Sequence, residues 1–555
     1  MDTALGAFGA LDVVLRRSME GLNFWQRFND SSESARKFYL LVDLQHARLA
    51  TWKKEWGIEP NNNYRQDHRF RDHQQRVMRQ LQYIHATLND FAANLSMPEL
   101  LLTQSNASIS TNLVQGLNHQ SAFSGPRDGV DSGTPTLSST QGIQWALRED
   151  RLEKDLDFLT KLVDGLYSIL PPPRHDPARH LVLSNSLTSL NPNDLTRIGH
   201  MGINPAFYAV LVWVNSCVPC SNGAQLGNHQ LQTSLLSPID CQENRSKFMA
   251  RYQGELVLAE KKVCTAAWGD VAQLNVLKAR IDQIVTRLQT PKKPTELSTL
   301  PCRGSIIIRD NPTAEDRTTW TYIIIYSADH PHFTSLRNLL SQKKRTSGNQ
   351  TSGKVHFSLG KRFALARTLG RAVMYLHLAN WLHKAIRSEN IVFFIDEDNH
   401  IRTHLPYIVG FEYSRLDVVG EQTENAEDKP DHRYYRHPRA MAVPVSEHHQ
   451  VLDGPGRYSK AYDIYSMGVV LLEIGRFMSA KSITEAYGLS KHATLEDVRN
   501  VFIEKAIPDL RLAMGDVYVD AVLICLNGSL DNLVGQSLDQ AFYENVVCQL
   551  DMCSA

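Results

Sequence analysis

No charge of one sign dominates this chain of 555 residues, because lysine and arginine together number 59 and aspartate and glutamate also number 59. A balanced charge provides no overall field to attract nucleic acid, so we predict no nucleic-acid partner. Long apolar runs are also lacking. The longest, Pro205 to Val214, is about half of the roughly 20 residues that a helix needs to span a bilayer. The sequence therefore predicts no constitutive transmembrane helix.

Cysteines are few and scattered, with eight in the whole chain. Cys217 and Cys220 have the spacing of zinc ligands, but no second cysteine pair or histidine pair follows at a suitable distance. We therefore predict no metal site. The sequence does not open with a charged segment, an apolar stretch and a cleavage site, as a secretory signal does. These features favour a reducing, cytoplasmic location.

Several enzyme motifs are missing as well. The sequence has no G-x-S-x-G nucleophile elbow, no H-E-x-x-H among its 21 histidines, and no G-x-G-x-x-G before its strand-like segments. These absences disfavour serine hydrolases, zinc proteases and enzymes with a glycine-rich phosphate loop. With 42% apolar and 21% charged residues the composition is that of an ordinary globular protein, and the length predicts two or three domains.

Helical periodicity characterises the first part of the chain. Apolar residues recur at steps of three, four and seven, which places them on one face of a helix. Such faces run from Phe38 to Trp56, from Phe70 to Leu95 and from Trp145 to Leu170, and a less regular apolar stretch covers Ala4 to Phe28. We predict an all-α bundle of four or five helices over residues 1–171.

Polar and proline-rich segments interrupt and then end this bundle. Residues 105–141 are rich in serine, asparagine, glycine and threonine, so we predict a mobile loop within the bundle there. Pro171, Pro172 and Pro173 end the last helix because proline lacks the backbone N–H. Residues 172–240 follow no clear pattern, and we interpret them as a linker or brace region.

Strand patterns begin near residue 241. Short runs typical of strands occupy Glu255–Val263, Ser305–Ile308 and Trp320–Tyr326. Val271–Leu288, between the first two, has helical spacing, and the sequence after Phe333 is mainly helical. The pattern predicts an α+β domain over residues 241–555, with a strand-rich lobe at about 241–330 and a helical lobe at about 331–555.

Five segments of the helical part resemble protein-kinase motifs in order and spacing. Trp381–Val392 is similar to the catalytic loop H-R-D-L-x-x-x-N, and Gly410-Phe411-Glu412 stands where D-F-G is expected. The others are Phe363–His377, similar to the helix before that loop, Tyr435–Arg439 with Pro438, similar to A-P-E, and Tyr462–Gly468 with Asp463, similar to the start of the central helix. The resemblance implies a two-lobed, protein-kinase-like fold.

The same resemblance implies that both catalytic aspartates are missing. Ala385 stands at the position of the aspartate that accepts the substrate proton, and Gly410 at that of the aspartate that binds magnesium. Asn390 retains the second metal ligand, but one amide oxygen is a poor magnesium site, and a structural role in its own loop is the simpler interpretation. We therefore predict a pseudokinase with no catalytic residue and no metal.

Other residues match family positions that serve the fold. In protein kinases the counterparts of His383 and Phe411 stack in an apolar spine between the lobes, and the counterpart of Asp463 holds the backbone of the catalytic loop. The resemblance implies the same structural roles here, and we include Pro438 with them.

Sequence support for a bound nucleotide is weak, so we predict no cofactor. In Val257–Lys262, Lys262 fits the register of the ATP-binding lysine, and Lys261 would share a strand face with Ala259. The usual glutamate partner is absent between Thr265 and Gln289. A solvated charge at the end of a strand is the simpler interpretation of these lysines. If ATP binds, Lys261, Lys262 and Asn390 are the expected contacts.

The first sixty residues resemble the HeLo domain of fungal prion-inhibition and propagation proteins. The resemblance is carried by the apolar opening Ala4–Leu15, by Gly21-Leu22 and by Leu41–Trp52 ahead of Gly57. It implies a role in regulated cell death or heterokaryon incompatibility, in which an N-terminal apolar segment is released into a membrane. Residues 4–15 would insert, with Arg16 and Arg17 at the headgroups. The alternative is that they form the first helix of the bundle.

Three functional hypotheses remain open from the sequence. The preferred one is a cytoplasmic signalling switch, similar in arrangement to the necroptosis executioner of animals, with protein partners at the kinase-like lobe. In it, membrane lipid binds residues 4–15 on activation, and the chain self-associates. The second is an unconventional ATP-dependent protein kinase that uses Glu412 or another acid for metal. The third is a protein-binding scaffold without membrane effects.

Overall fold

The computed structural model describes most of the chain in two compact units, Met1–Tyr208 and Ala209–Ala555. The described residues are 4–26, 32–58, 68–95, 139–170, 190, 195–196, 205–216, 230–239, 246–267, 271–290, 293–309, 317–341, 357–417, 430–441, 458–490, 492–532 and 537–555. The predicted loop at 105–141 lies outside them up to residue 138, and its last three residues are helical instead. Cys217 and Cys220 also lie outside the described residues.

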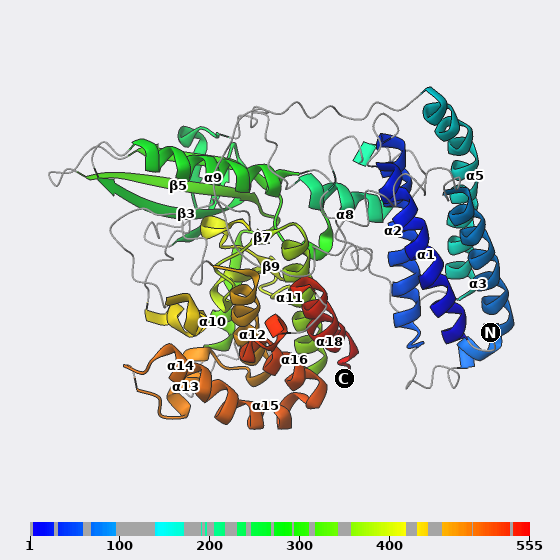
Figure 1. Cartoon of the computed structure of the whole chain (residues 1–555). Helices are drawn as coiled ribbons and strands as arrows, with labels where there is room; N and C mark the ends of the chain where they lie inside the picture. The colour runs from blue at the N-terminus through cyan, green and yellow to red at the C-terminus, as the bar shows by residue number, and fades with distance from the viewer. Residues whose placement is uncertain are drawn as a thin grey trace, which may run out of the picture. The chain divides into compact units, whose positions relative to one another are not determined.

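Four long helices form most of the described part of the first unit, and Figure 1 labels each of them. They are α1 (Ala4–Gln26), α2 (Ser32–Glu55), α3 (His68–Leu95) and α5 (Ser139–Ile169). Helix α1 contacts α2 and α3, and α5 contacts the same two helices, so the four close a ring around a shared core. The helices predicted from the apolar periodicity are confirmed.

Aromatic packing defines the centre of this core. Trp52 of α2 is fully buried, and its ring stacks on that of Phe8 of α1 with 5.8 Å between the centroids. The indole Nε1–H of Trp52 donates to the carbonyl oxygen of Leu170 at 2.8 Å. Because a buried donor without a partner costs about 1–3 kcal/mol, this bond lets the tryptophan fill the core and anchors the end of α5.

The N-terminal apolar segment belongs to the same core. Ala7, Phe8, Leu11, Val14 and Leu15 are all buried in it, and in this structure the segment is the first helix of the bundle. Val13 lies on the opposite side of α1 and is 57% exposed. Among the helices that the structure describes, none combines the length and the apolar character that a bilayer span requires.

An antiparallel sheet of five strands, in the order β1-β2-β3-β5-β4, opens the second unit. The strands are β1 (Leu236–Pro238), β2 (Lys247–Tyr252), β3 (Glu255–Ala267), β4 (Cys302–Arg309) and β5 (Arg317–Ser327), and α9 (Val271–Gln289) connects β3 to β4. The patterns that predicted β3, β4, β5 and α9 are confirmed. The sequence did not predict β1 and β2, nor the apolar helix α8 (Pro205–Ser216), which lies within the region interpreted as a linker or brace.

A two-residue turn fixes the register between β2 and β3. Gln253 and Gly254 both adopt positive φ, at 52° and 85°, which is the backbone geometry of a tight hairpin. The register that follows places Lys247 of β2 directly opposite Glu260 of β3. Cross-strand partners share a face of the sheet, so these two charged side chains point to the same side.

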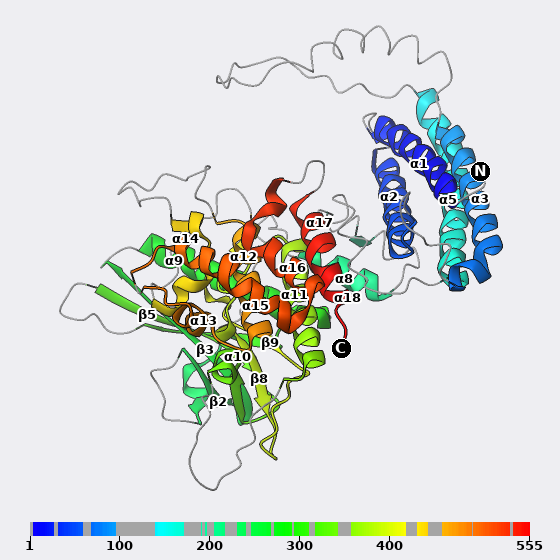
Figure 2. The same ribbon diagram turned by 90° about the horizontal axis from the view of Figure 1, so that it is seen from below.

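Helices dominate the remainder of the second unit, as Figure 2 shows. They are α10 (Leu336–Leu340), α11 (Leu359–Leu378), α12 (Lys460–Arg476), α13 (Ala480–Ala486), α14 (Leu495–Asn500), α15 (Ile507–Met514), α16 (Asp516–Asn527), α17 (Leu538–Phe542) and α18 (Cys548–Met552). Helix α12 is buried from Asp463 to Gly475 and contacts α11, α15 and α16. It is the centre of the helical part.

Two small antiparallel sheets join this helical part. One contains β6 (His332–Ser335), β8 (Ile391–Ile395) and β9 (Tyr407–Ile408), and the other contains β7 (Trp381–Leu382) and β10 (Arg415–Leu416). The predicted architecture, a helical N-terminal region followed by a mixed region of helices and antiparallel sheets, is confirmed. The small sheets hold the loops after β7 and β9 next to each other.

We predict that Leu11→Ala lowers the free energy of unfolding of the first unit by about 2–5 kcal/mol, because it leaves a cavity in the bundle core. The matched change Val13→Ala, on the exposed side of the same helix, should stay within about 0.5 kcal/mol. Urea unfolding followed by circular dichroism measures both. Equal effects at the two positions would contradict the packing of α1 described above.

Candidate functional site

Asp463, in the first turn of α12, organises the loop that follows β7. Its two carboxylate oxygens accept the backbone N–H groups of His383 and Lys384, at 2.7 and 2.9 Å. Lys384 has a φ of 65°, which is unfavourable for a residue with a side chain, and the second bond stabilises that conformation. Burial alone would raise the pKa of Asp463, but His377, His383 and the hydrogen bond from Tyr458 together lower it below its ordinary value.

A stack of buried rings joins this loop to the loop after β9. The ring centroids of His383 and Phe411 lie 4.6 Å apart, and those of Trp381 and Phe411 lie 5.2 Å apart. All three side chains are buried. Burial lowers the pKa of His383 to about 4, so the imidazole is neutral at pH 7 and packs as an aromatic ring.

Asn390 occupies the space in front of Gly410. Its amide Nδ2 donates to the carbonyl oxygen of Ala385 at 2.7 Å. Gly410 adopts a φ of 92°, and a Cβ atom at this position would overlap the amide group of Asn390. An aspartate at position 410 is therefore incompatible with this orientation of Asn390.

Lys247 reaches this amide from the sheet. Its Nζ donates to Oδ1 of Asn390 at 2.7 Å and lies 3.8 Å from Oε1 of Glu260. The second carboxylate oxygen of Glu260 accepts the hydroxyl of Tyr326 at 3.1 Å. Glu260 is 2% exposed and Lys247 is 8% exposed, so the ammonium group lies in a largely dry environment.

Two buried glutamates share this environment and differ in charge. Burial and the neighbouring Glu412 raise the pKa of Glu260 to about 8, against a smaller opposing effect of Lys247. Burial would also raise the pKa of Glu412, but Lys247 and Arg387 lower it below its ordinary range. The Arg387 guanidinium lies 3.8 Å from Glu412. At neutral pH Glu260 therefore holds a proton, and Glu412 is ionised.

Lys262 lies on the same side of β3 as Glu260. Its Nζ donates to the backbone carbonyl of Glu412 at 3.0 Å and lies 4.3 Å from the ring centroid of Tyr413. The interpretation of Lys262 as a solvated edge charge is wrong, because contacts with the loop after β9 bury it. Lys261 points to the other side of β3 and is half-buried.

We call Lys247, Glu260, Lys262, Tyr326, Arg387, Asn390 and Glu412 the charge cluster. The remaining predicted residues do not belong to it. Ala385 is buried, and its side chain offers no polar atom. Pro438 begins a short 3-10 helix, Pro438–Met441, and the preceding His437 stacks on Tyr462 with 4.7 Å between centroids. These contacts attach the segment at Pro438 to α12.

Four members of the cluster were missed from the sequence: Lys247, Glu260, Tyr326 and Arg387. Glu260 and Lys262 are two apart on one strand, so their alternation already places both side chains on one face. This alternation alone predicts that Glu260 lies beside Lys262 in the site. Lys247 could not be predicted as a site residue, because its strand was not predicted. That strand is short and has charged residues at two of its six positions.

A second group of potential metal ligands occurs in the turn after β8. The ligand atoms of Asp396, Asp398 and His400 all lie within 4.8 Å of one another. The backbone N–H of His400 donates to Oδ1 of Asp396 at 2.7 Å, which accounts for their proximity. Asp398 and His400 are exposed, so this group is explained by the turn itself.

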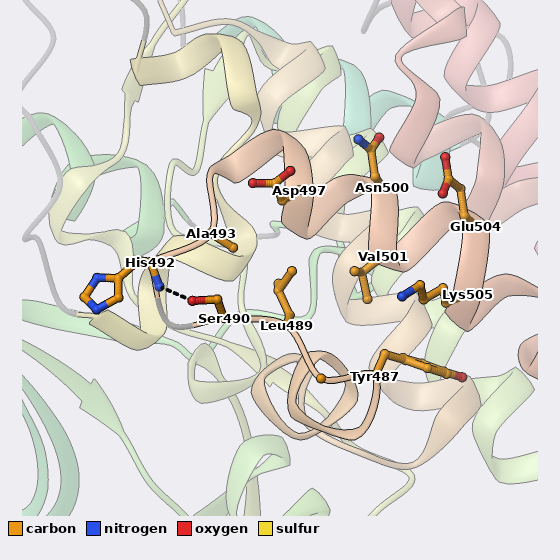
Figure 3. A pocket seen from close by; sticks show the side chains of 11 residues that line it. Tyr487, Leu489, Ser490, His492, Ala493, Asp497, Asn500, Val501, Glu504 and Lys505 are labelled. Carbon is orange, nitrogen blue, oxygen red and sulfur yellow. Dashed lines mark hydrogen bonds between the residues drawn. The ribbon is translucent and has the colours of Figure 1, made fainter.

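A separate pocket of about 430 Å³ lies beside α14, lined by residues between Tyr487 and Lys505 (Figure 3). Its lining includes Asp497, whose carboxylate and backbone form a capping box with Thr494 at the start of α14. The pocket shares no lining residue with the charge cluster around Lys247. The carboxylate of Asp497 therefore has a local structural partner.

We predict that Glu260 makes the free energy of unfolding of the second unit fall as pH rises from 6.5 to 8, above the pH range in which the lowered pKa values of His383 and His437 give the opposite slope. The folded chain keeps the proton of Glu260 up to about pH 8, whereas an ordinary glutamate loses it near pH 4.5, so unfolding releases a proton in this interval. One such proton contributes at most about 1.4 kcal/mol per pH unit. Urea unfolding at several pH values should show a flatter dependence for Glu260→Gln.

Glu473 gives a residual pH dependence that the Glu260→Gln variant should keep. Burial raises its pKa to about 7, so it contributes a slope of the same sign, which remains in the Glu260→Gln variant. Identical slopes for the unmodified chain and the variant would show that Glu260 is ionised in the folded state.

Two protein families match parts of the chain. Residues 302–552, which include Asn390 and Glu412 but not Lys247, Glu260 or Lys262, match a domain of unknown function, DUF7580. Residues 3–196 match the family described as prion-inhibition and propagation, the HeLo family, and this match extends beyond the predicted boundary at residue 171. The match supports a HeLo domain in the N-terminal region, and that domain suggests signalling in fungal cell death or incompatibility.

Proposed function

We propose that the chain is a signalling switch in which the HeLo domain is coupled to a kinase-like domain without catalytic activity. The observation that carries this proposal is the arrangement of Ala385, Asn390 and Gly410. Two positions that need carboxylates for phosphoryl transfer have none, and the amide of Asn390 occupies the space that a side chain at position 410 would need. Fungal cell death or incompatibility is the setting that the HeLo match favours.

The contacts of Asp463 and Phe411 support the kinase-like part of the proposal. Asp463 on the central helix holds the backbone of the loop at His383, as the resemblance implies for its kinase counterpart. The rings of His383 and Phe411 are packed against each other, with 4.6 Å between their centroids, which agrees with the spine contact that the resemblance implies. A five-stranded sheet with one helix, followed by a helical part, is the order of elements that a two-lobed kinase-like fold requires.

Unconventional catalysis is the second candidate, because Glu260 and Glu412 bring two carboxyl groups to the cleft region. Two facts weigh against it. Glu260 is protonated at neutral pH, and the ammonium of Lys247 already contacts Asn390. A buried lysine at the metal position opposes the binding of a magnesium–nucleotide complex through charge repulsion.

We predict no phosphoryl transfer by the full chain with magnesium or manganese and labelled ATP, either to itself or to a general protein substrate. Ala385→Asp restores the missing base alone and should remain inactive, because the metal position is still blocked. Gly410→Asp is a poor control, since its side chain would overlap Asn390. Transfer by the unmodified chain that Glu412→Gln abolishes would establish the enzyme hypothesis instead.

The membrane and partner roles form the second part of the proposal. Residues 4–15 would insert into a membrane after leaving the bundle, protein partners would bind the kinase-like domain, and activated chains would self-associate. Withdrawal of α1 exposes Phe8, Leu11 and Leu15, each of which contributes about 2 kcal/mol by burial. Release therefore needs a partner or a membrane that offsets several kcal/mol.

We predict that a disulfide between α1 and α3 blocks dye release from vesicles of phosphatidylcholine and phosphatidylserine. A Cβ atom at Gly21 would lie 3.1 Å from that of Leu95. Disulfides have a Cβ–Cβ separation of about 3.5–4.5 Å, so Gly21→Cys with Leu95→Cys can form the bond after the two helices shift apart by a few tenths of an ångström. With heating below the unfolding temperature, the reduced double variant should release dye and the oxidised one should not.

The two single-cysteine variants control for the substitutions themselves. Equal release by the oxidised and reduced double variants would show that α1 does not need to leave the bundle. Absence of release by every variant and by the unmodified chain would remove the membrane role from the proposal, and leave the scaffold hypothesis.

A further inference from the structure

Cationic side chains border α1 at the end of the bundle where this helix begins. Lys53 of α2 has its Nζ 6.0 Å from the ring centroid of Phe8, so it lies beside the second turn of α1. Arg71 of α3 is exposed and follows Phe70, whose ring centroid is 6.5 Å from that of Trp52. Because Trp52 also stacks on Phe8, the start of α3 lies close to the start of α1.

Helix geometry shows on which side of α3 Arg71 lies. The side-chain amide of Gln80 donates to the carbonyl oxygen of Leu162 on α5, at 2.6 Å, so Gln80 marks the α5 side of α3. Arg71 comes nine residues earlier, which is two and a half turns, and therefore lies on the opposite side of the helix. Helix α3 packs against α5 on one side and α1 on the other. Lys53 and Arg71 thus flank α1 from its two neighbouring helices.

Helix α1 itself supplies the middle of this surface. Val13 is 57% exposed on the outer side of the helix. Arg16 and Arg17, in the next turn, are exposed as well, and neither forms an ion pair with a residue that the structure describes. We call the surface made of five side chains the α1 face: Val13, Arg16, Arg17, Lys53 and Arg71. It combines one exposed apolar side chain with four cations.

Charge differs between the α1 face and the helix diagonally across the bundle. The acids on α1 are Asp12 and Glu20, and Asp12 lies 3.9 Å from Nε2 of His46. Two acids therefore stand against the four cations of the α1 face. Helix α5, which packs against α2 and α3, has six acidic and four basic residues. An anionic surface attracts the α1 face and repels α5, so charge orients the bundle with α1 toward that surface.

We propose that the α1 face of the folded bundle binds the headgroups of anionic phospholipids before α1 leaves the bundle. An exposed apolar side chain between basic ones is typical of a surface that lies in a membrane interface. Each lysine or arginine near an anionic leaflet strengthens binding, over a range of about 10 Å at 0.1 M salt. The inference rests on the membrane role proposed above. It deepens that role by naming the lipid class and by placing docking before the release of α1.

Vesicle binding by a chain that cannot release α1 tests the proposal. The full chain with the oxidised Gly21→Cys, Leu95→Cys disulfide keeps α1 in the bundle. Co-sedimentation with vesicles of equal parts phosphatidylcholine and phosphatidylserine measures its binding, and vesicles of phosphatidylcholine alone are the reference. Lys53→Gln with Arg71→Gln, in the same oxidised chain, removes two charges from the α1 face.

Arg76→Gln with Lys154→Gln is the matched control, because it removes two exposed cations from the other side of the bundle. Arg76 is four residues from Gln80 and so lies on the α5 side of α3, and Lys154 belongs to α5 itself. The net charge of the chain changes equally in the two double variants. Only the position of the lost charges differs.

We expect the oxidised chain to bind the phosphatidylserine vesicles, to ignore phosphatidylcholine alone, and to release no dye. Lys53→Gln with Arg71→Gln should weaken this binding by about tenfold or more, and the control by less than about twofold. Equal effects of the two double variants would overturn the proposal, and so would equal binding to both kinds of vesicle. Binding that appears only after reduction of the disulfide would also overturn it, since docking would then require the release of α1.

Two further measurements keep the test decisive. If Lys53→Gln with Arg71→Gln does not fold, Arg16→Gln with Arg17→Gln replaces it at exposed positions of the same face, with the same expected result. If the disulfide does not form, the chain without the two cysteines is compared at a temperature at which the vesicles retain their dye. Dye that is never released removes the insertion step of the proposed function, whereas the docking step is decided by sedimentation alone.

Discussion

The amide of Asn390 is the contact on which the geometry of the second unit's central site depends. One end of it donates to the carbonyl of Ala385 and the other accepts from Lys247, so it connects the loop after β7 to the sheet. This is possible only because residue 410 has no side chain. The absence of a side chain at position 410 therefore has a structural consequence. It creates the room in which a lysine-to-amide contact closes the site.

The charged side chains of this region contact one another because they are buried away from water. Lys247, Lys262 and Arg387 supply positive charge, and each contacts the region of Glu260 or Glu412. Burying any of these groups alone would cost several kcal/mol, whereas together they compensate one another. With Glu260 protonated and Glu412 ionised, the three cationic groups outnumber the carboxylates, and Glu389, 3.9 Å from Arg387, supplies a further negative charge. The carboxyl and amide oxygens of the site are thus contacted by cationic groups of the chain itself.

Sequence reasoning reached the helices and the longer strands because apolar periodicity depends on local geometry alone. It located Asp463, His383 and Phe411 through motif spacing, and the structure brings those residues into contact. The charge cluster could not be predicted from the sequence, for a physical reason. Lys247 and Asn390 are 143 residues apart and meet only through the fold. Strands β1 and β2 were missed because they are short, and β2 also carries charges that weaken its strand pattern. Helix α8 was missed because its residues are apolar on nearly every side and so show no helical periodicity.

The tight turn at Gln253 and Gly254 lies outside the charge cluster, yet it decides which residues enter it. Side chains alternate along a strand, so inserting or deleting one residue in this hairpin would exchange the two faces of β2. Phe248, which now packs against the apolar side of the sheet, would then face the carboxyl groups, and the ammonium would be turned away from them. The length of this turn thus determines whether a charged or an apolar side chain of β2 faces the buried carboxyl groups.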